Sequence, residues 1–363
     1  MQRFLFRNSN LRSPALLSAP APYRIPPIHA TKPGLGFFDF QPANILELGP
    51  NADAFRLQGT LKTQRFIRID QDANLYIPAG KGIDLQRGAV ENHGTIELGS
   101  GGAASFRSNR IYGDNDLKIG INGTNVANFT VTDCIFDGNF QPIRLEGASS
   151  QFTNLTQIKT TIFQNYLLRA VEIHHRGGIL YENCTFKGQG ASDAGVVSKF
   201  NLVTILRNCT LQDHNNPQQV QTGNPLVGLQ ASVIVDGDWI CWMDGGEIRN
   251  GVVGILNSDL TDAAPCNVIM SHQATIRDCY AGVAIRGNAT IGQIIMDCAR
   301  LIGNQYGIYA EDAGIVISPE LLSQQTTGIF YPGRSPTNLS FFNRKFKRSL
   351  ENSTRCAYLC VRF

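Results

Sequence analysis

The sequence lacks an apolar run of the roughly 18 residues that a membrane-spanning helix requires, so no membrane span is expected. Charged residues are scarce, at 17% of the chain, against about 25% in an average soluble domain. The N-terminus shows only Leu16-Leu17 where a signal peptide needs an apolar stretch of roughly 7–15 residues. The chain contains no phosphate-binding loop, HExxH, GxSxG or protein-kinase motif, so none of those enzyme classes is indicated.

The residues that are present favour a folded, turn-rich β protein. Hydrophobic residues make up 42% of the 363 residues, which is enough for a sizeable core and excludes wholesale disorder. Glycine occurs 36 times and asparagine 28 times, and both residue types are favoured in turns.

The net charge of +3 is unevenly distributed along the chain. Residues 1–38 contain five basic residues and no acidic one, and residues 321–363 contain seven basic residues and one acidic one. The middle of the chain therefore has an excess of acidic residues. We do not expect it to bind nucleic acid.

A related phrase recurs along the sequence, at a period near 25 residues. The copies start at residues 134, 161, 184, 209, 246, 274 and 299. Such a period indicates a solenoid, with insertions confined to particular steps. Its units show the period-2 alternation of short strands and no run long enough for a helical repeat. The pattern predicts a coil of three short strands per turn, stacked into parallel sheets.

Three cysteines share one position of this repeat. Cys134, Cys184 and Cys209 align, with Thr161 at the same position in the copy between the first two. We expect them to be reduced and buried as small apolar residues inside the coil, with disulfides or metal binding as the alternatives. The polar residue before each of them is expected at a corner with a left-handed backbone, which Asn and Asp tolerate.

Several of these phrases resemble a known family. NCTFKG at 183–188, RNCTLQD at 207–213, YAGVAI at 280–285 and QYGIYA at 305–310 are similar to the repeats of right-handed parallel β-helix proteins of the pectin-lyase-like class. The resemblance covers residues 130–318 clearly and 60–130 more weakly. It implies an all-β right-handed parallel β-helix over residues 39–323, with irregular first coils to about 130. Residues 1–38 are then a disordered or targeting-like leader, and residues 324–363 a basic non-repeat tail.

The resemblance implies a fold more specifically than an activity, because the class includes polysaccharide lyases, hydrolases, epimerases and non-catalytic surface proteins. The Asp-Asp, GHG, RIK and DPHE motifs of its enzymes are absent here. This favours a non-catalytic extracellular or cell-surface module that contacts carbohydrate or a partner along its sheet face. A polysaccharide lyase or glycoside hydrolase with an atypical site is the alternative.

Candidate ligand-binding residues follow from aligning the strand after each phrase. The aligned apolar positions are Ile143, Val171, Val196, Val227, Ile255, Val283 and Ile308. Three residues further on, an outward column is polar throughout: Glu146, His174, Lys199, Gln230, Ser258, Arg286 and Glu311. We take Glu146, His174, Lys199, Arg286 and Glu311 as the candidates for binding sugar hydroxyls or acidic sugars. The same column is also consistent with acid–base chemistry, or with a solvated face of alternating charges.

Metal ligands are sparse in the sequence. Asp236 and Asp238 flank a glycine and are able to supply two oxygens to calcium, or to form an acidic turn. His174 and His175 are adjacent, so on a strand they point to opposite faces and do not share a metal. No other metal or cofactor is expected.

Overall fold

The computed structural model describes part of the 363-residue chain. The described residues are 10–11, 45–48, 55–57, 61–62, 66–69, 74–84, 88–113, 119–147, 155–190, 192–214, 231–259, 266–287, 292–297, 299–311, 315–317, 329–330 and 340–341. They form strands, turns and bends, with no helix among them. In particular, no described helix is long and apolar enough to cross a membrane.

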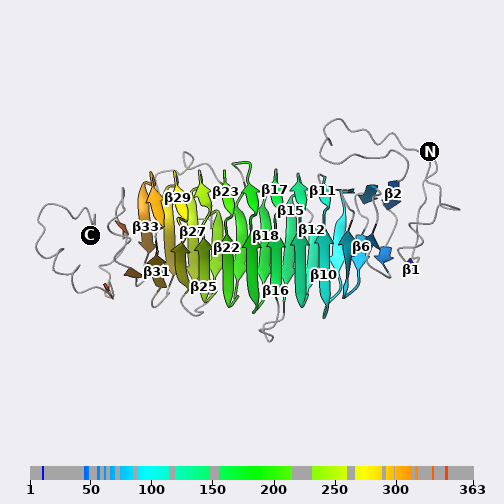
Figure 1. Ribbon diagram of the computed structural model, residues 1–363, viewed down its shortest axis with the longest axis horizontal. Helices are drawn as coiled ribbons and strands as arrows, with labels where there is room; N and C mark the ends of the chain where they lie inside the picture. The colour runs from blue at the N-terminus through cyan, green and yellow to red at the C-terminus, as the bar shows by residue number, and fades with distance from the viewer. Residues whose placement is uncertain are drawn as a thin grey trace, which may run out of the picture. The chain divides into compact units, whose positions relative to one another are not determined.

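The chain divides into two compact units, Met1–His175 and Arg176–Phe363, and each is built from three parallel sheets. Within each unit the labelled strands lie side by side (Figure 1). In the first unit, sheet A contains, in spatial order, β1 (Asn10–Leu11), β3 (Phe55–Leu57), β6 (Asn74–Ile77), β9 (Thr95–Leu98), β12 (Ile119–Thr124), β15 (Gln141–Glu146) and β18 (Arg169–His174). Sheet B contains β2 (Ile45–Leu48), β5 (Phe66–Ile69), β8 (Ala89–Asn92), β11 (Arg110–Tyr112), β14 (Ile135–Asp137) and β17 (Ile162–Gln164). Sheet C contains β4 (Leu61–Lys62), β7 (Lys81–Asp84), β10 (Ala103–Arg107), β13 (Asn128–Thr132) and β16 (Leu155–Lys159).

The second unit repeats this plan. Its sheet A contains β21 (Ala194–Lys199), β24 (Val233–Asp236), β27 (Val253–Asp259), β30 (Ala281–Gly287), β33 (Tyr306–Glu311) and β35 (Ile329–Phe330). Its sheet B contains β20 (Thr185–Lys187), β23 (Thr210–Gln212), β26 (Glu247–Arg249), β29 (Thr275–Arg277) and β32 (Arg300–Ile302). Its sheet C contains β19 (Gly178–Glu182), β22 (Val203–Arg207), β25 (Ile240–Asp244), β28 (Asn267–Ser271), β31 (Gly292–Met296), β34 (Ile315–Ile317) and β36 (Ser340–Phe341).

These pairings confirm the predicted fold, an all-β parallel solenoid with about 25 residues per turn. Arg110, for example, lies opposite Ile135, which is 25 residues further along the chain. Alternate residues point into the coil, and the middle residue of each short sheet B strand is buried. In the first unit Phe136 and Phe163 stack there at 4.9 Å between ring centroids. Residues of the same type in neighbouring coils therefore pack against each other.

The leader and tail predicted at residues 1–38 and 324–363 lie mostly outside the described residues. Within them, the structure describes only three two-residue strands. Asn10–Leu11 pairs with β3, Ile329–Phe330 with β33 and Ser340–Phe341 with β34, all in parallel. The proposed domain boundaries stay predictions.

The corner before sheet B explains the recurring Asp/Asn-Cys phrase. Asp133, Asn183 and Asn208 have φ angles of 55°, 55° and 50°, which confirms the predicted left-handed corners. The cysteine that follows each corner is 1% exposed and forms no disulfide, and Thr161 is 0% exposed. The hydroxyl of Thr161 and the thiols of the three cysteines each donate to the backbone carbonyl two residues earlier. The shared position is therefore an inward one, as predicted.

We expect Cys134, Cys184 and Cys209 to resist thiol reagents until the protein unfolds. Burial raises the pKa of the Cys134 thiol to about 12, and the thiolate is the reactive form. Peptide mapping after brief alkylation, in buffer and in denaturant, measures each cysteine separately. If all three cysteines of the native protein are labelled as fast as those of the denatured protein, the inward position assigned to them is contradicted.

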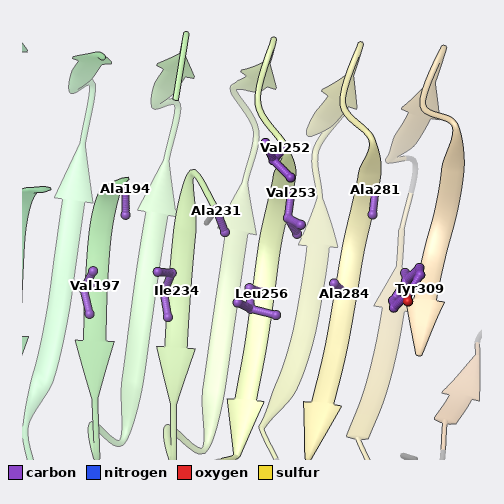
Figure 2. Close-up of a cluster of buried hydrophobic side chains, with 10 residues drawn as sticks. All are labelled: Ala194, Val197, Ala231, Ile234, Val252, Val253, Leu256, Ala281, Ala284 and Tyr309. Atoms are coloured by element: carbon purple, nitrogen blue, oxygen red, sulfur yellow. The ribbon is translucent and has the colours of Figure 1, made fainter. Parts of the chain in front are cut away.

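An apolar cluster lies on the outer face of sheet A in the second unit (Figure 2). Val197, Ile234 and Leu256 alternate with inward valine and isoleucine residues and so point away from the coil interior. They are nevertheless 0–2% exposed. The cluster comprises Ala194, Val197, Ala231, Ile234, Val252, Val253, Leu256, Ala281, Ala284 and Tyr309. Because these side chains are buried, this part of the face offers no ligand-binding surface.

Candidate functional site

Sheet A of the first unit carries charged and amide side chains on its outer face. Glu97, Asn122, Arg144 and Glu172 lie opposite one another on four successive strands, from β9 to β18. Neighbouring strands are about 4.8 Å apart, so the four side chains form one polar column. Two residues further along the strands, Glu146 lies opposite His174. We call these residues, with Gln141 and Arg169, the polar face.

Glu172 is the centre of the polar face. Its Oε1 lies 3.0 Å from Arg169 Nη1 and 2.8 Å from His174 Nε2, while Gln141 Nε2 donates to Oε2 at 2.8 Å. Only 5% of the residue is exposed. Burial alone would raise the pKa of this carboxyl, but the contacts with His174, Arg169 and Gln141 outweigh it and hold the pKa well below its usual range. Glu172 is therefore a fixed carboxylate that positions three donors.

Arg144 and Glu146 form an ion pair beside this centre, within the same strand. Their side chains are 37% and 44% exposed, respectively. A pair with this exposure contributes little stability and keeps hydrogen-bonding capacity toward solvent. The pair therefore offers a ligand donors and acceptors on a rigid strand.

Glu97 and Asn122 continue the column toward the N-terminus. Asn122 Nδ2 donates to the two carboxylate oxygens of Glu97 at 3.1 and 3.3 Å. Burial raises the pKa of Glu97, and the hydrogen bond from Asn122 partly opposes that shift. Two carboxyls of one face thus have pKa values shifted in opposite directions, Glu97 upward and Glu172 downward.

The strand register brings several residues of the predicted column side by side within each unit, while their role in ligand binding stays a prediction. Glu146 lies opposite His174 in the first unit, and Arg286 lies opposite both Ser258 and Glu311 in the second. Lys199 lies opposite Asp236. The alignment was wrong in one coil, because Val233 and not Val227 follows Val196 in register. Asp236 therefore takes the place assigned to Gln230, which lies outside the described residues.

Sequence reasoning missed the residues that organise the polar face. Arg144 and Glu172 share their register column with apolar residues elsewhere in the chain, such as Val197 and Leu256 in the second unit. The column therefore did not look polar throughout. Gln141 and Arg169 lie at the starts of their strands, and only the folded structure brings them to Glu172.

The two aspartates considered for calcium lie in different environments. Asp236 is on β24 opposite Lys199 and is 5% exposed, whereas Asp238 is 0% exposed and lies inside the coil. Oδ2 of Asp238 accepts hydrogen bonds from Ser198 at 2.5 Å and Thr204 at 3.0 Å, and Oδ1 accepts one from the Asn201 N–H at 2.9 Å. The described residues contain no group of three or more His, Cys, Asp or Glu side chains placed to hold a metal ion.

The adjacent histidines separate as predicted. His174 stays on the polar face with 22% of its side chain exposed, while His175 is 4% exposed and its Nε2 lies 3.2 Å from the Thr156 hydroxyl. Burial lowers the pKa of His175 to about 4.

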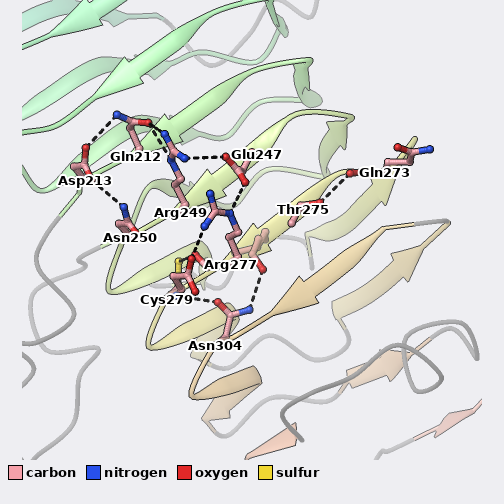
Figure 3. A network of polar contacts seen from close by, with 12 residues as sticks. Gln212, Asp213, Glu247, Arg249, Asn250, Gln273, Thr275, Arg277, Cys279 and Asn304 are labelled. Atoms are coloured by element: carbon pink, nitrogen blue, oxygen red, sulfur yellow. Dashed lines mark hydrogen bonds and ion pairs between the residues drawn. The ribbon is translucent and has the colours of Figure 1, made fainter.

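The outer face of sheet B in the second unit provides a contrast (Figure 3). Arg277 Nε donates to Glu247 at 2.5 Å, its Nη1 donates to Asp278 at 2.6 Å, and Arg249 Nη2 donates to Gln212 at 2.6 Å. This chain of mutually paired side chains has the character of a solvated surface. It lacks the buried charged centre that Glu172 supplies on the polar face.

Comparison of the chain with protein-family models, with curated proteins and with solved structures found no match. The fold and the polar face define a parallel β-solenoid that carries an ordered, charged surface on sheet A of its first unit.

Proposed function

We propose that the protein is an extracellular or cell-surface β-helix module that binds carbohydrate through the polar face, without catalysis. The observation that carries the proposal is the Glu172 centre, where a buried carboxylate holds Arg169, His174 and Gln141 in place. Positioned donors and acceptors on rigid strands suit a ligand rich in hydroxyl groups. The similarity of the repeats to the pectin-lyase-like class supports the same ligand class by analogy.

A polysaccharide lyase or glycoside hydrolase is the second candidate, favoured by the contact between Glu172 and His174. Glycoside hydrolysis needs two carboxyls roughly 5–9.5 Å apart. Glu97 and Glu172, whose pKa values differ in the required sense, are separated by three strand steps of about 4.8 Å each. The nearer carboxyl, Glu146, lies diagonal to Glu172 on the next strand but is paired with Arg144. Both oxygens of Glu172 are also occupied by protein donors. These features favour binding over catalysis.

A location outside the cell agrees with the scarcity of charge. The six described cysteines form no disulfide and are buried, and buried thiols of raised pKa are protected from oxidants. An oxidising compartment is therefore compatible with the cysteine content.

The test is a binding screen against oligosaccharides, followed by calorimetry on one pair of variants. We expect Arg144→Ala to weaken binding of the best oligosaccharide by roughly tenfold or more, because hydrogen bonds from a charged group contribute about 1.5–3 kcal/mol. Glu172→Ala should weaken it further, since it releases all three positioned donors.

The matched control is Arg107→Ala, which removes an exposed arginine from the outer face of sheet C in the same unit. Its affinity should equal that of the wild type. Binding that survives both polar-face variants with an unchanged dissociation constant, or a wild type that binds no oligosaccharide, would overturn the proposal. Release of unsaturated or hydrolysed products during the titration would favour the enzymatic candidate.

A further inference from the structure

Two aromatic side chains are exposed at the corner that follows sheet A in the second unit. Phe200 is 42% exposed, and Trp239 is 56% exposed. The backbone N–H of Trp239 donates to the backbone carbonyl of Asn201 at 3.0 Å, so Trp239 lies on the coil next to that of Phe200. Rings of this size are normally buried, and exposed ones are typical of binding surfaces.

The backbone of Phe200 makes its exposure more informative. Its φ angle is 62°, in the left-handed region that bulky L-residues rarely adopt. The Phe200 N–H donates to the Asp236 carbonyl, which places Phe200 beside Gly237, where φ is 70°. In the first unit the residue that follows β12 at the same kind of corner is Asn125, with a φ of 56°. Glycine and asparagine tolerate this conformation, whereas phenylalanine adopts it only at a cost in strain.

Phe200 is thus strained and solvent-exposed at once. Neither property stabilises the fold, and an asparagine or glycine would satisfy the corner better. Residues that have an unfavourable backbone conformation, with no packing gain to offset it, are concentrated at functional sites. The position of the ring, and not its packing, is therefore the feature that needs explaining.

The corner is held rigidly from inside the coil. Asp238 lies between Gly237 and Trp239, and its buried carboxylate accepts hydrogen bonds from Asn201 and Ser198, which flank Phe200 and Lys199. Asn201 Nδ2 in turn donates to Ser198 Oγ at 2.8 Å. The two neighbouring coils are thereby joined at the residues that carry the rings, which reduces the ordering cost of binding.

We propose that Phe200 and Trp239 form a stacking platform for the pyranose rings of a neutral glycan. A flat aromatic face matches the apolar C–H face of a sugar ring, and Lys199, directly before Phe200, supplies a donor for its hydroxyls. Lys199 lies opposite Asp236, so the charges beside the platform balance and give no preference for an acidic chain. The inference rests on the proposed function, because it assigns the same ligand class.

The test measures the affinity of cellohexaose, mannohexaose and xylohexaose as neutral probes, and of a hexagalacturonate as the acidic probe. We expect one of the neutral probes to bind more tightly than the hexagalacturonate. Trp239→Ala should weaken that neutral probe by roughly tenfold, as loss of a tryptophan contact does at binding surfaces. Phe200→Asn should also weaken it while leaving the melting temperature unchanged or higher, because asparagine relieves the left-handed strain. Leu167→Ala is the control, since Leu167 is 45% exposed elsewhere and its removal should not change binding.

The outcomes separate this inference from the proposed function. If a probe binds and Arg144→Ala weakens it, but Trp239→Ala and Phe200→Asn do not, the platform is overturned and the polar face stands. Tighter binding of the hexagalacturonate overturns the neutral ligand class. Self-association that is lost in Trp239→Ala, with unchanged glycan affinity, shows that the rings contact protein and also overturns it. A wild type that binds none of the probes overturns both proposals.

Discussion

Replacing Asp238 with asparagine should stabilise the protein at pH 8 and change its stability little at pH 4. Burial raises the pKa of Asp238 from 3.8 to about 7, although hydrogen bonds from Ser198, Asn201 and Thr204 oppose the shift. The folded state therefore binds this proton more tightly than the unfolded state does. The stability that results is complete below about pH 4 and is lost as the pH rises through about 7.

The expected size of the effect is large. Each pKa unit corresponds to about 1.4 kcal/mol, so removing the ionisation should raise the free energy of unfolding at pH 8 by roughly 2–4 kcal/mol relative to the wild type. Asparagine keeps the shape of the neutral acid, and the hydroxyls of Ser198 and Thr204 are able to reorient toward its amide.

Urea denaturation of the wild type and Asp238→Asn between pH 4 and pH 8 measures the difference. Buried His175 and His214, whose pKa values burial lowers to about 4 and about 3, add a loss of stability below pH 6.5. That loss is common to both proteins and cancels in the comparison. Asp238→Ala is the control, because it leaves three buried donors unpaired and should destabilise the protein at every pH. If the free energies of unfolding of the wild type and Asp238→Asn change in parallel from pH 4 to pH 8, the raised pKa of Asp238 is contradicted.

Replacing Gly246 with alanine should destabilise the protein by roughly 3–5 kcal/mol, from left-handed strain plus overpacking. Gly246 has a φ of 81° and occupies, one coil after Cys209, the inward position that follows the corner. A Cβ there would lie 2.2 Å from the Cys209 carbonyl oxygen and 2.6 Å from its nitrogen. Both are backbone atoms, so the coil itself would have to move.

Gly190→Ala is the matched control, because Gly190 has a φ of 74° and nothing within 4 Å of the added Cβ. It should cost only the left-handed strain of about 1 kcal/mol. Thermal or urea denaturation of the two variants separates conformational strain from the steric clash. Equal losses of stability would show that the close approach of Gly246 to Cys209 is not a property of the protein.

Most of the fold could be predicted from the sequence, because every coil of a solenoid needs the same residue types at its inward and corner positions. The inward position of Cys134 and Thr161 and the left-handed corner at Asp133 recur, so the aligned sequence shows them directly. The misplaced coil shows the limit of this approach. Between Cys209 and Gly246 the repeat is lengthened, and Val227 matched the apolar pattern as well as Val233, which is the residue actually in register.

The candidate site was predictable only in part. The sequence identified Glu146 and His174 as neighbours because both lie in a column that stays polar. It did not identify Glu172 as the centre, since its contacts with Arg169 and Gln141 depend on side chains that converge across two strands. Period-2 alternation also does not reveal that outward residues such as Leu256 are buried. Alternation predicts the direction in which a side chain points, but not whether other residues bury it.

The proposal that the polar face binds carbohydrate is tested most directly by carboxyl footprinting with and without the tightest-binding oligosaccharide. The side chain of Glu146 is 44% exposed, so a carbodiimide should modify it readily in the free protein. Bound oligosaccharide should protect Glu146 and leave unchanged the modification of Glu247, which is 31% exposed on sheet B. Saturating oligosaccharide that leaves Glu146 fully reactive, or that protects Glu247 instead, would contradict the proposal.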